Sequence, residues 1–135
     1  MLNIKMELDK RIIFLKSYLR FYEIENVEIT SIELNSINGY CFFPEEEDIE
    51  FQKQEFCWHI KEDEVPSTQA MELMQFIQKN KLHTTDKIII SDEELFEKLK
   101  WKDFDEFKRI YYSLYEIEIK MIDDGVETGS YYIHD

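Results

Sequence analysis

Residues 91–133 read SDEELFEKLKWKDFDEFKRIYYSLYEIEIKMIDDGVETGSYYI, and this stretch decides the fold. Ser91 and Glu94 form a capping box, in which each side chain can bond the backbone amide of the other residue, so a helix is predicted to start there. From Phe104 onward, apolar side chains recur every three or four positions. That spacing predicts a second helix over residues 104–116, after a short turn.

The segments on either side of these two helices complete the pattern. Residues 117–121 and 130–133 are rich in β-branched and aromatic residues and flank a loop with an Asp-Gly pair, so they predict a hairpin. Upstream, residues 67–81 predict a helix with a Ser or Thr cap, and residues 86–90 predict a short strand.

The resulting order of helix, short strand, two helices and hairpin resembles a winged helix over residues 67–135. The resemblance implies that the helix at 104–116 would be the recognition element and that the hairpin loop would be the wing. DNA-binding wings usually present Lys or Arg to the phosphate backbone. Here the loop carries Asp123, Asp124 and Glu127 and no base, so the sequence argues against DNA as the ligand.

The N-terminal part of the chain changes from a helical to a strand pattern. Apolar positions spaced by three and four predict a helix over about residues 6–23. Residues 27–34, 40–43 and 49–60 predict three strands, with a turn at residues 35–39 where a Gly can take a positive φ. We expect these strands to form an antiparallel meander packed on the first helix.

Together these segments predict an α+β protein. An N-terminal helix and three-stranded meander, residues 1–65, would pack on a winged-helix-like half, residues 66–135. The charged connector at 62–66 is the best candidate boundary. Because this connector is short, we expect the two halves to share a core and to form a single compact unit.

The chain is strongly acidic, with 30 Asp and Glu against 16 Lys and Arg and a formal net charge of −14. Residues 1–65 hold 15 acids and 7 bases, and residues 66–135 hold 15 acids and 9 bases. This even division suggests that the negative field belongs to the whole folded body. Such a field repels nucleic acid and steers cationic partners toward the protein.

The cysteines and the absence of a long apolar run predict a cytoplasmic location. Cys41 and Cys57 lie in apolar, strand-like contexts and are predicted to be buried free thiols, with a disulfide between neighbouring strands as the alternative. No run reaches the roughly 18 apolar residues of a membrane span. The start of the sequence shows no basic leader followed by an apolar stretch.

Motifs for catalysis and metal binding are absent from the sequence. It contains no Gly-rich phosphate loop, no Gly-x-Ser-x-Gly and no His-Glu-x-x-His. The acidic run at residues 45–48 lacks the Gly and the ligand spacing of a calcium loop, and His59, His83 and His134 lie far apart. We therefore predict no catalytic residue, no cofactor and no metal.

Tyrosines gather in the second half of the chain. With Phe104, Phe107, Ile110 and Leu114 facing inward, the helix at 104–116 leaves other tyrosines on its outer side, where they can anchor a protein partner. The alternative, that half of these rings only pack this helix against the hairpin, stays open. The predicted partner-binding residues are Asp105, Tyr112, Tyr115, Asp123, Asp124 and Glu127.

The leading hypothesis is a non-catalytic, acidic protein-binding module that masks a basic, possibly nucleic-acid-binding, surface of a partner. In this it would be similar to an immunity protein or a phage-type inhibitor, and the richness in Ile, Lys, Glu and Asn suggests a bacterial or phage source. One alternative is a winged-helix DNA-binding transcriptional regulator. Another is an enzyme whose site forms only in the tertiary structure. The oligomeric state stays open under each hypothesis.

Overall fold

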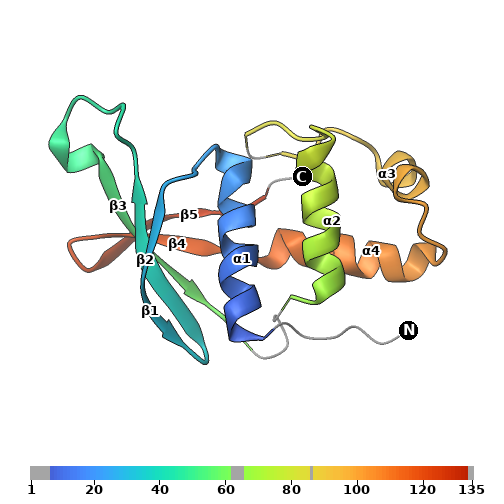
Figure 1. Cartoon of the computed structure of the whole chain (residues 1–135), viewed down its shortest axis with the longest axis horizontal. Coiled ribbons are helices and arrows are strands. Elements are labelled where there is room, and N and C mark those ends of the chain that lie inside the picture. Colours follow the sequence, from blue (N-terminus) through green and yellow to red (C-terminus); the bar gives the residue numbers. More distant parts are fainter. Residues whose placement is uncertain (1–6, 62–65, 86, 134–135) are drawn as a thin grey trace.

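The protein is α+β, with one five-stranded antiparallel sheet and its helices on one side of that sheet (Figure 1). The computed structural model describes residues 7–61, 66–85 and 87–133, so the predicted boundary at 62–66 lies almost entirely outside the described residues. The elements are α1 (Leu8–Leu19), η1 (Arg20–Tyr22), β1 (Val27–Glu33), β2 (Ser36–Phe42), η2 (Ile49–Phe51), β3 (Lys53–His59), α2 (Thr68–Lys79), α3 (Asp92–Leu99), α4 (Phe104–Ser113), η4 (Leu114–Glu116), β4 (Ile119–Asp123) and β5 (Val126–Tyr131).

The first hairpin turns earlier than the sequence predicted. β1 and β2 are paired up to Glu33 and Ser36, so the expected turn at residues 35–39 is wrong and Gly39 lies inside β2. A Cβ atom at Gly39 would lie 2.2 Å from the carbonyl oxygen of Glu28 on β1. The glycine therefore permits a close approach of two strands, in a sheet region that also contains a β-bulge.

The third predicted strand also starts at a different residue. Ile49–Phe51 form the 3₁₀ turn η2, and β3 begins at Lys53, so the prediction of a strand over 49–60 is wrong for its first four residues. The amide of Phe51 donates to the Asp48 carbonyl at 3.0 Å, which closes this turn locally. The alternating pattern thus extends into a loop that makes its own hydrogen bonds.

Pairing between β3 and β4 joins the two halves of the chain. Glu55 is paired with Ile122 and Cys57 with Lys120, so β4 and β5 continue the sheet of β1–β3. The hairpin predicted as a wing is therefore two strands of a five-stranded sheet. What the structure shows of the predicted winged helix is the order α2, α3, α4 and hairpin.

Two of the three helices of the second half begin at predicted caps, and the third begins at Asp103, which lies in the turn predicted from the sequence. The Ser67 hydroxyl accepts from the Ala70 amide at 3.1 Å, and the Ser91 hydroxyl accepts from the Glu94 amide at 3.3 Å. The Asp103 carboxylate caps α4, which becomes a 3₁₀ turn after Ser113. The prediction of two helices joined by a turn before residue 104 is confirmed.

The strand predicted at residues 86–90 is wrong for the part that the structure describes. Ile88 makes an isolated bridge with His83, and the Ile89 amide donates to the Leu82 carbonyl at 3.0 Å. The segment folds back on the residues just before it. Within the described residues no longer strand lies beside it, so the β-branched side chains there do not extend a sheet.

One hydrophobic core is shared by α1, the sheet and the later helices. α1 packs on the inner face of the sheet, and α2 packs against both α1 and α4 (Figure 1). The buried Tyr18 hydroxyl donates to the Ile117 carbonyl at 2.8 Å and accepts from the Ile133 amide at 2.9 Å. Side chains that are fully buried in this core include Phe14, Tyr18, Phe21, Phe56, Leu73, Leu95 and Phe107.

Candidate functional site

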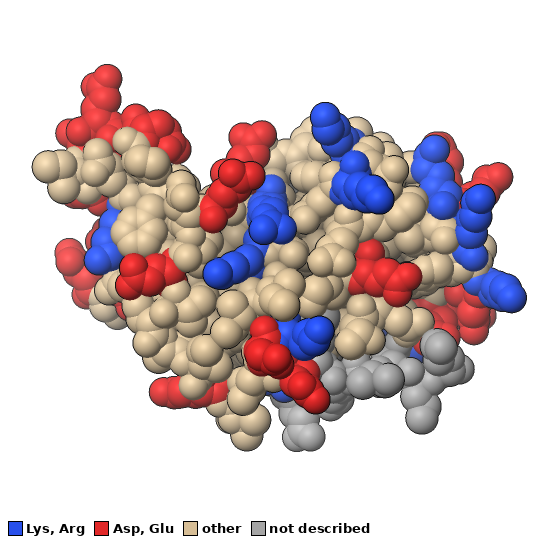
Figure 2. All heavy atoms as spheres, in the orientation of Figure 1, with Lys and Arg blue, Asp and Glu red and all other residues tan. Residues whose placement is uncertain are grey.

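Acidic charge is concentrated in the sheet and its loops. Residues 23–60 and 119–131 contain 13 Asp and Glu but only Lys53 and Lys120 as bases, a formal net charge of −11. The rest of the chain contains 17 acids and 14 bases, a net charge of −3. On the face in Figure 2, acids cluster on the loop that projects from the sheet, whereas most visible Lys and Arg lie over the helices.

This distribution corrects the prediction that the negative field belongs to the whole body. Charge is even along the chain, but it is polarised in space because the strands of the sheet come from both halves of the sequence. The strongest negative potential therefore lies at the sheet, and cationic groups will be drawn there first.

The β2–β3 loop carries the densest acidic run and projects from the end of the sheet (Figure 1). Residues 44–52 read PEEEDIEFQ, with five acids and no base. The amide of Phe43 donates to the Gln52 carbonyl at 2.7 Å, and Gln52 Nε2 donates to the Glu46 carbonyl at 2.7 Å. The acids are therefore presented on a closed loop with its own hydrogen bonds, and this reduces the entropy lost when a partner binds.

Two large apolar side chains are exposed among these acids. Ile49 is 83% exposed and Phe51 is 59% exposed. Both belong to the 3₁₀ turn η2, and Glu50 lies between them. Exposed apolar side chains rimmed by charge are typical of binding surfaces, because covering them removes apolar area from water.

The β4–β5 turn repeats this composition. Asp124 and Gly125 have φ values of 52° and 79°, the two positive values that a type I′ hairpin turn requires. Asp123, Asp124 and Glu127 are exposed, and Val126 is 63% exposed.

Antiparallel pairing places these two turns at the same end of the sheet. The β2–β3 loop leads directly into β3, and β4 leads directly into the β4–β5 turn. Glu55, near the start of β3, is paired with Ile122, near the end of β4. We call residues 45–51 and 123–127 the hairpin-end surface. It contains eight acids and no base, together with exposed Ile49, Phe51 and Val126.

The predicted partner-binding residues are divided between distant parts of the molecule. Asp123, Asp124 and Glu127 belong to the hairpin-end surface. Asp105 lies in the first turn of α4, at the opposite end of the long axis (Figure 1). These four acids therefore do not form the single rim that the sequence suggested.

The two predicted anchor tyrosines make contacts within the helices. Tyr112 is 45% exposed, and its hydroxyl donates to Asp92 at 2.5 Å, which links α4 to the start of α3. Tyr115 is half-buried, and its hydroxyl donates to the Tyr111 hydroxyl at 2.9 Å. Tyr115 therefore contacts its own helical segment and packs against the core.

Sequence reasoning did not identify the apolar members of the hairpin-end surface. The sequence predicts Ile49 and Phe51 as the start of a strand because they continue an alternating pattern. A useful signal was available, since the pattern follows Pro44 and four consecutive acids, a composition that favours a loop. Val126 had no such signal, because its position beside the other loop depends on the pairing of β3 with β4.

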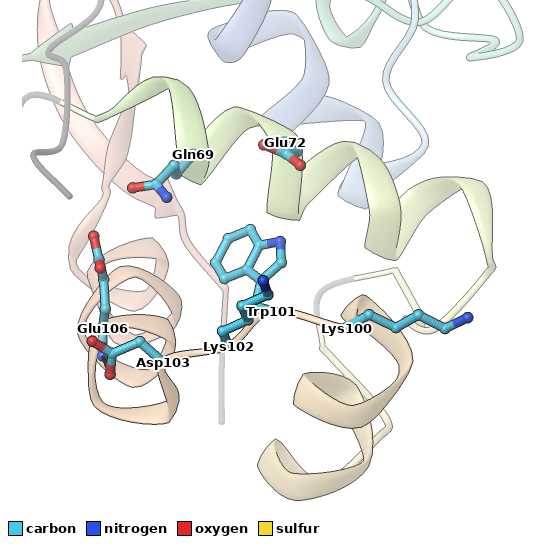
Figure 3. Close-up of a pocket in the computed structure, with 7 residues that line it drawn as sticks. All are labelled: Gln69, Glu72, Lys100, Trp101, Lys102, Asp103 and Glu106. Atoms are coloured by element: carbon cyan, nitrogen blue, oxygen red, sulfur yellow. Dashed lines mark hydrogen bonds between the residues drawn. The ribbon is translucent and has the colours of Figure 1, made fainter.

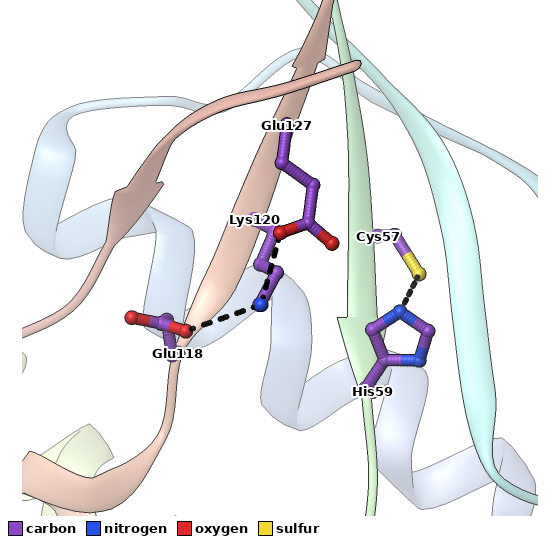
Figure 4. Close-up of polar contacts among 5 residues, drawn as sticks. All are labelled: Cys57, His59, Glu118, Lys120 and Glu127. Atoms are coloured by element: carbon purple, nitrogen blue, oxygen red, sulfur yellow. Dashed lines mark hydrogen bonds and ion pairs between the residues drawn. The ribbon is translucent and has the colours of Figure 1, made fainter. Parts of the chain in front are cut away.

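A Cys-His pair lies on the sheet face away from the helices (Figure 4). Cys57 Sγ lies 3.5 Å from His59 Nε2, and Lys120 nearby pairs with Glu127 at 3.0 Å. Burial raises the pKa of the Cys57 thiol, and the negative charges of Glu127 and Glu55 raise this pKa further. A reactive cysteine needs a lowered pKa, so this pair does not resemble a nucleophilic site.

The prediction of two buried free thiols is confirmed. Cys41 is paired with Gln54 and Cys57 with Asn38, so the two cysteines are offset along the strands and point to opposite faces of the sheet. Burial raises the pKa of Cys41 to about 12, so this thiol stays protonated.

The structure describes residues 7–61, 66–85 and 87–133, which bear on metal binding and membrane spanning as well. In that part of the chain, no three His, Cys, Asp or Glu side chains are grouped so that they could hold a metal ion. His134 lies outside it. None of the described helices combines the length and the apolar composition needed to cross a membrane. Comparison of the chain with protein-family models, curated proteins and solved structures found no match. The surface of this chain is therefore the guide to its function.

Proposed function

We propose that this protein is a non-catalytic module that binds a basic protein partner through its hairpin-end surface. The main support is the combination of eight acids, no base and three exposed apolar side chains on two turns at one end of the sheet. The acids would speed encounter with a cationic surface and select it, and the apolar side chains would supply affinity once they are covered.

A partner that fits this surface presents Lys or Arg around an apolar depression. Surfaces that bind nucleic-acid phosphates have such cationic character. The proposed action is therefore to mask such a surface in the cytoplasm, as an immunity protein or a phage-type inhibitor would.

The order of elements over residues 67–135 is like that of a winged helix, and this makes DNA binding the second candidate function. Binding of DNA by α4 has weak support. Lys108 lies over the Phe104 ring at 5.3 Å, and Arg109 pairs with Glu106 at 3.5 Å, so both bases of this helix contact their own helix. The would-be wing is the acidic β4–β5 turn.

The proposal is tested with a set of immobilised variants that share one fold. The set contains the wild type, an Ile49→Ser/Phe51→Ser variant, an Asp123→Asn/Asp124→Asn variant, and a Glu93→Gln/Glu97→Gln variant. The last pair lies on α3 and removes the same charge as the Asp pair, so it controls for net charge. Proteins captured from the native host are identified by mass spectrometry, and affinities are then measured with the purified partner.

We expect the apolar variant to lose about 30-fold or more in affinity, since loss of an anchor typically costs at least ~2 kcal/mol. The Asp pair should mainly slow association and weaken its dependence on salt. The α3 pair should behave like the wild type. If the folded apolar variant binds as the wild type does, the surface lies elsewhere. Sub-micromolar binding of duplex DNA near 150 mM salt would favour the regulator instead, since non-specific binders lie at roughly 10⁻⁴–10⁻⁶ M.

A further inference from the structure

A second feature with binding character is a cleft between α2 and the turn that joins α3 to α4 (Figure 3). Its volume is ≈ 430 Å³, within the range of sites that hold small ligands or a partner's side chain. The cleft belongs to the helical part of the protein, far along the molecule from the hairpin-end surface (Figure 1).

The indole of Trp101 stands in the middle of this cleft (Figure 3). The residues on either side of Trp101 hold its backbone in place. Lys100 ends α3 in the left-handed conformation, with φ 61°, and Asp103 caps α4 by accepting from the Glu106 amide at 3.1 Å. The half-buried ring also packs edge-on against the Phe107 ring, with 6.1 Å between the ring centroids, and this contact fixes its orientation.

Carboxylates line the cleft on both sides of the indole. Glu72 comes from α2, and Asp103 and Glu106 come from the start of α4 (Figure 3). The Glu106 side chain is only 16% exposed, and its ion pair with Arg109 is long, at 3.5 Å. A carboxylate with so little access to water gains from a second, closer cation.

Neither of the two lysines that line the cleft makes a cation–ring contact with Trp101. The Lys100 side chain extends away from the indole (Figure 3). Lys102 is exposed, and among the described residues the cation–ring contacts involve Lys53 and Lys108, not Trp101. Within the described residues, therefore, no cation lies over the Trp101 ring, and Lys100 and Lys102 line the cleft beside it.

We propose that this cleft binds a guanidinium group, carried by an arginine side chain of a polypeptide. A guanidinium is planar, so it can stack on the indole while its N–H groups bond a carboxylate in a bidentate manner. The cleft offers both partners, the Trp101 ring and the carboxylates of Glu72 and Glu106. A lysine ammonium can meet the charge but has no planar face to stack.

This site does not depend on the hairpin-end surface, and the two proposals can fail separately. The probe is Nα-acetyl-arginine amide, titrated into ¹⁵N-labelled protein at 150 mM salt. The readout is the indole N–H signal of Trp101, which is assigned by its loss in Trp101→Phe. The buried Trp58, 3% exposed, provides an internal reference signal.

We expect the Trp101 signal to shift and saturate with a Kd on the order of 1 mM, a value suited to a ligand of this size. Nα-acetyl-lysine amide should bind more weakly, and the isosteric but uncharged citrulline derivative should give no saturable shift. Glu106→Gln and Glu72→Gln should each weaken binding several-fold. Glu93→Gln on α3 and Asp123→Asn in the β4–β5 turn should leave it unchanged.

Three results would overturn the assignment. The first is equal shifts with the arginine and citrulline probes. The second is a linear shift of Trp101 that never saturates. The third is loss of arginine binding in Asp123→Asn, because this would place the probe on the acidic end of the sheet. The folded state of Glu106→Gln is verified by its thermal transition, and Glu72→Gln provides a second variant on a different helix.

Discussion

The sheet region and the helical region of this protein differ in their balance of acidic and basic residues. The sheet region, residues 23–60 and 119–131, has 13 acids and two bases. In the remainder, acids and bases are nearly balanced, at 17 and 14. Of the large apolar side chains that the structure describes, the most exposed is Ile49, at 83%, and it lies in a loop of the sheet region outside the core.

The difference shows that the net charge alone does not indicate where the electric field of the protein is strongest. The positions of the charged residues in the fold are needed as well. A value of −14 spread evenly would mean solubility and weak repulsion. Most of that charge on one side of the molecule gives an oriented field, and the acidic turns lie at one end of the sheet. The helices, whose aromatic rings pack closely around Phe107, are the part in which packing dominates.

The largest effect should separate the core of the sheet from its loop. Phe56→Ala should lower the free energy of unfolding by about 3–5 kcal/mol, because the side chain is fully buried and its loss leaves a cavity. Phe51→Ala, at a side chain 59% exposed, should change it by no more than ~0.5 kcal/mol. Urea unfolding measures both. A large loss in Phe51→Ala would mean that the loop is part of the core after all.

A smaller effect should come from the hydroxyl that connects the two regions. Tyr18→Phe removes the partner of the Ile133 amide and should lower stability by about 1–3 kcal/mol. Burial raises the pKa of Tyr18 far above its ordinary value, so the neutral hydroxyl is the form that matters. Tyr40→Phe, on the sheet face away from the helices, is the matched control. Equal stability of these two variants in thermal unfolding would show that the connection is dispensable.

Protonation of His83, which lies between α2 and α3, should make the free energy of unfolding depend on pH. Burial lowers the pKa of His83, so the unfolded chain binds more protons than the folded protein at acidic pH. The His83 contribution should be fully present above the ordinary histidine pKa of about 6.5 and should fall as pH drops through that value toward the folded pKa. In His83→Gln this part of the pH dependence should disappear. The prediction would be contradicted if the difference in free energy of unfolding between the wild type and His83→Gln were the same at pH 8 and at pH 5.

The smallest effect should have opposite signs in the two regions. Glu46→Gln should raise stability by a few tenths of a kcal/mol, because it relieves repulsion within the acidic β2–β3 loop. Glu93→Gln should lower it by about 0.3–1 kcal/mol, because that carboxylate lies in the first turn of α3 and favours the helix dipole. Differential scanning calorimetry at low salt should show the contrast, and 1 M salt should remove most of it. Changes of the same sign would mean that local position does not control these charges.

Local signals in the sequence were enough to locate the helices. Ser67 and Ser91 cap their helices through atoms within three residues, so the information lies in the sequence itself. The turn predicted at Gly39 is wrong because the role of this glycine depends on the position of Glu28 across the strand pair. Strand register depends on distant residues, and no single segment encodes it.

The candidate site was less predictable for the same physical reason. Asp123, Asp124 and Glu127 were recognised as an acidic group, and the run at 45–48 was noticed separately. Only the pairing of Glu55 with Ile122 shows that both groups lie at one end of one sheet. The outward direction of Tyr112 followed from helical spacing, but its contact with Asp92 on the preceding helix did not.

The hydrogen bonds of Tyr18 also have a consequence for synthesis on the ribosome. The hydroxyl of this residue on α1 is bonded to residues that follow it by 99 and 115 positions. Until those residues emerge, the buried oxygen has neither of these two partners, and the edge of β3 that pairs with β4 is open. The first half of the nascent chain must therefore wait in an incomplete state, with apolar surface and a strand edge exposed, as long-range pairing requires.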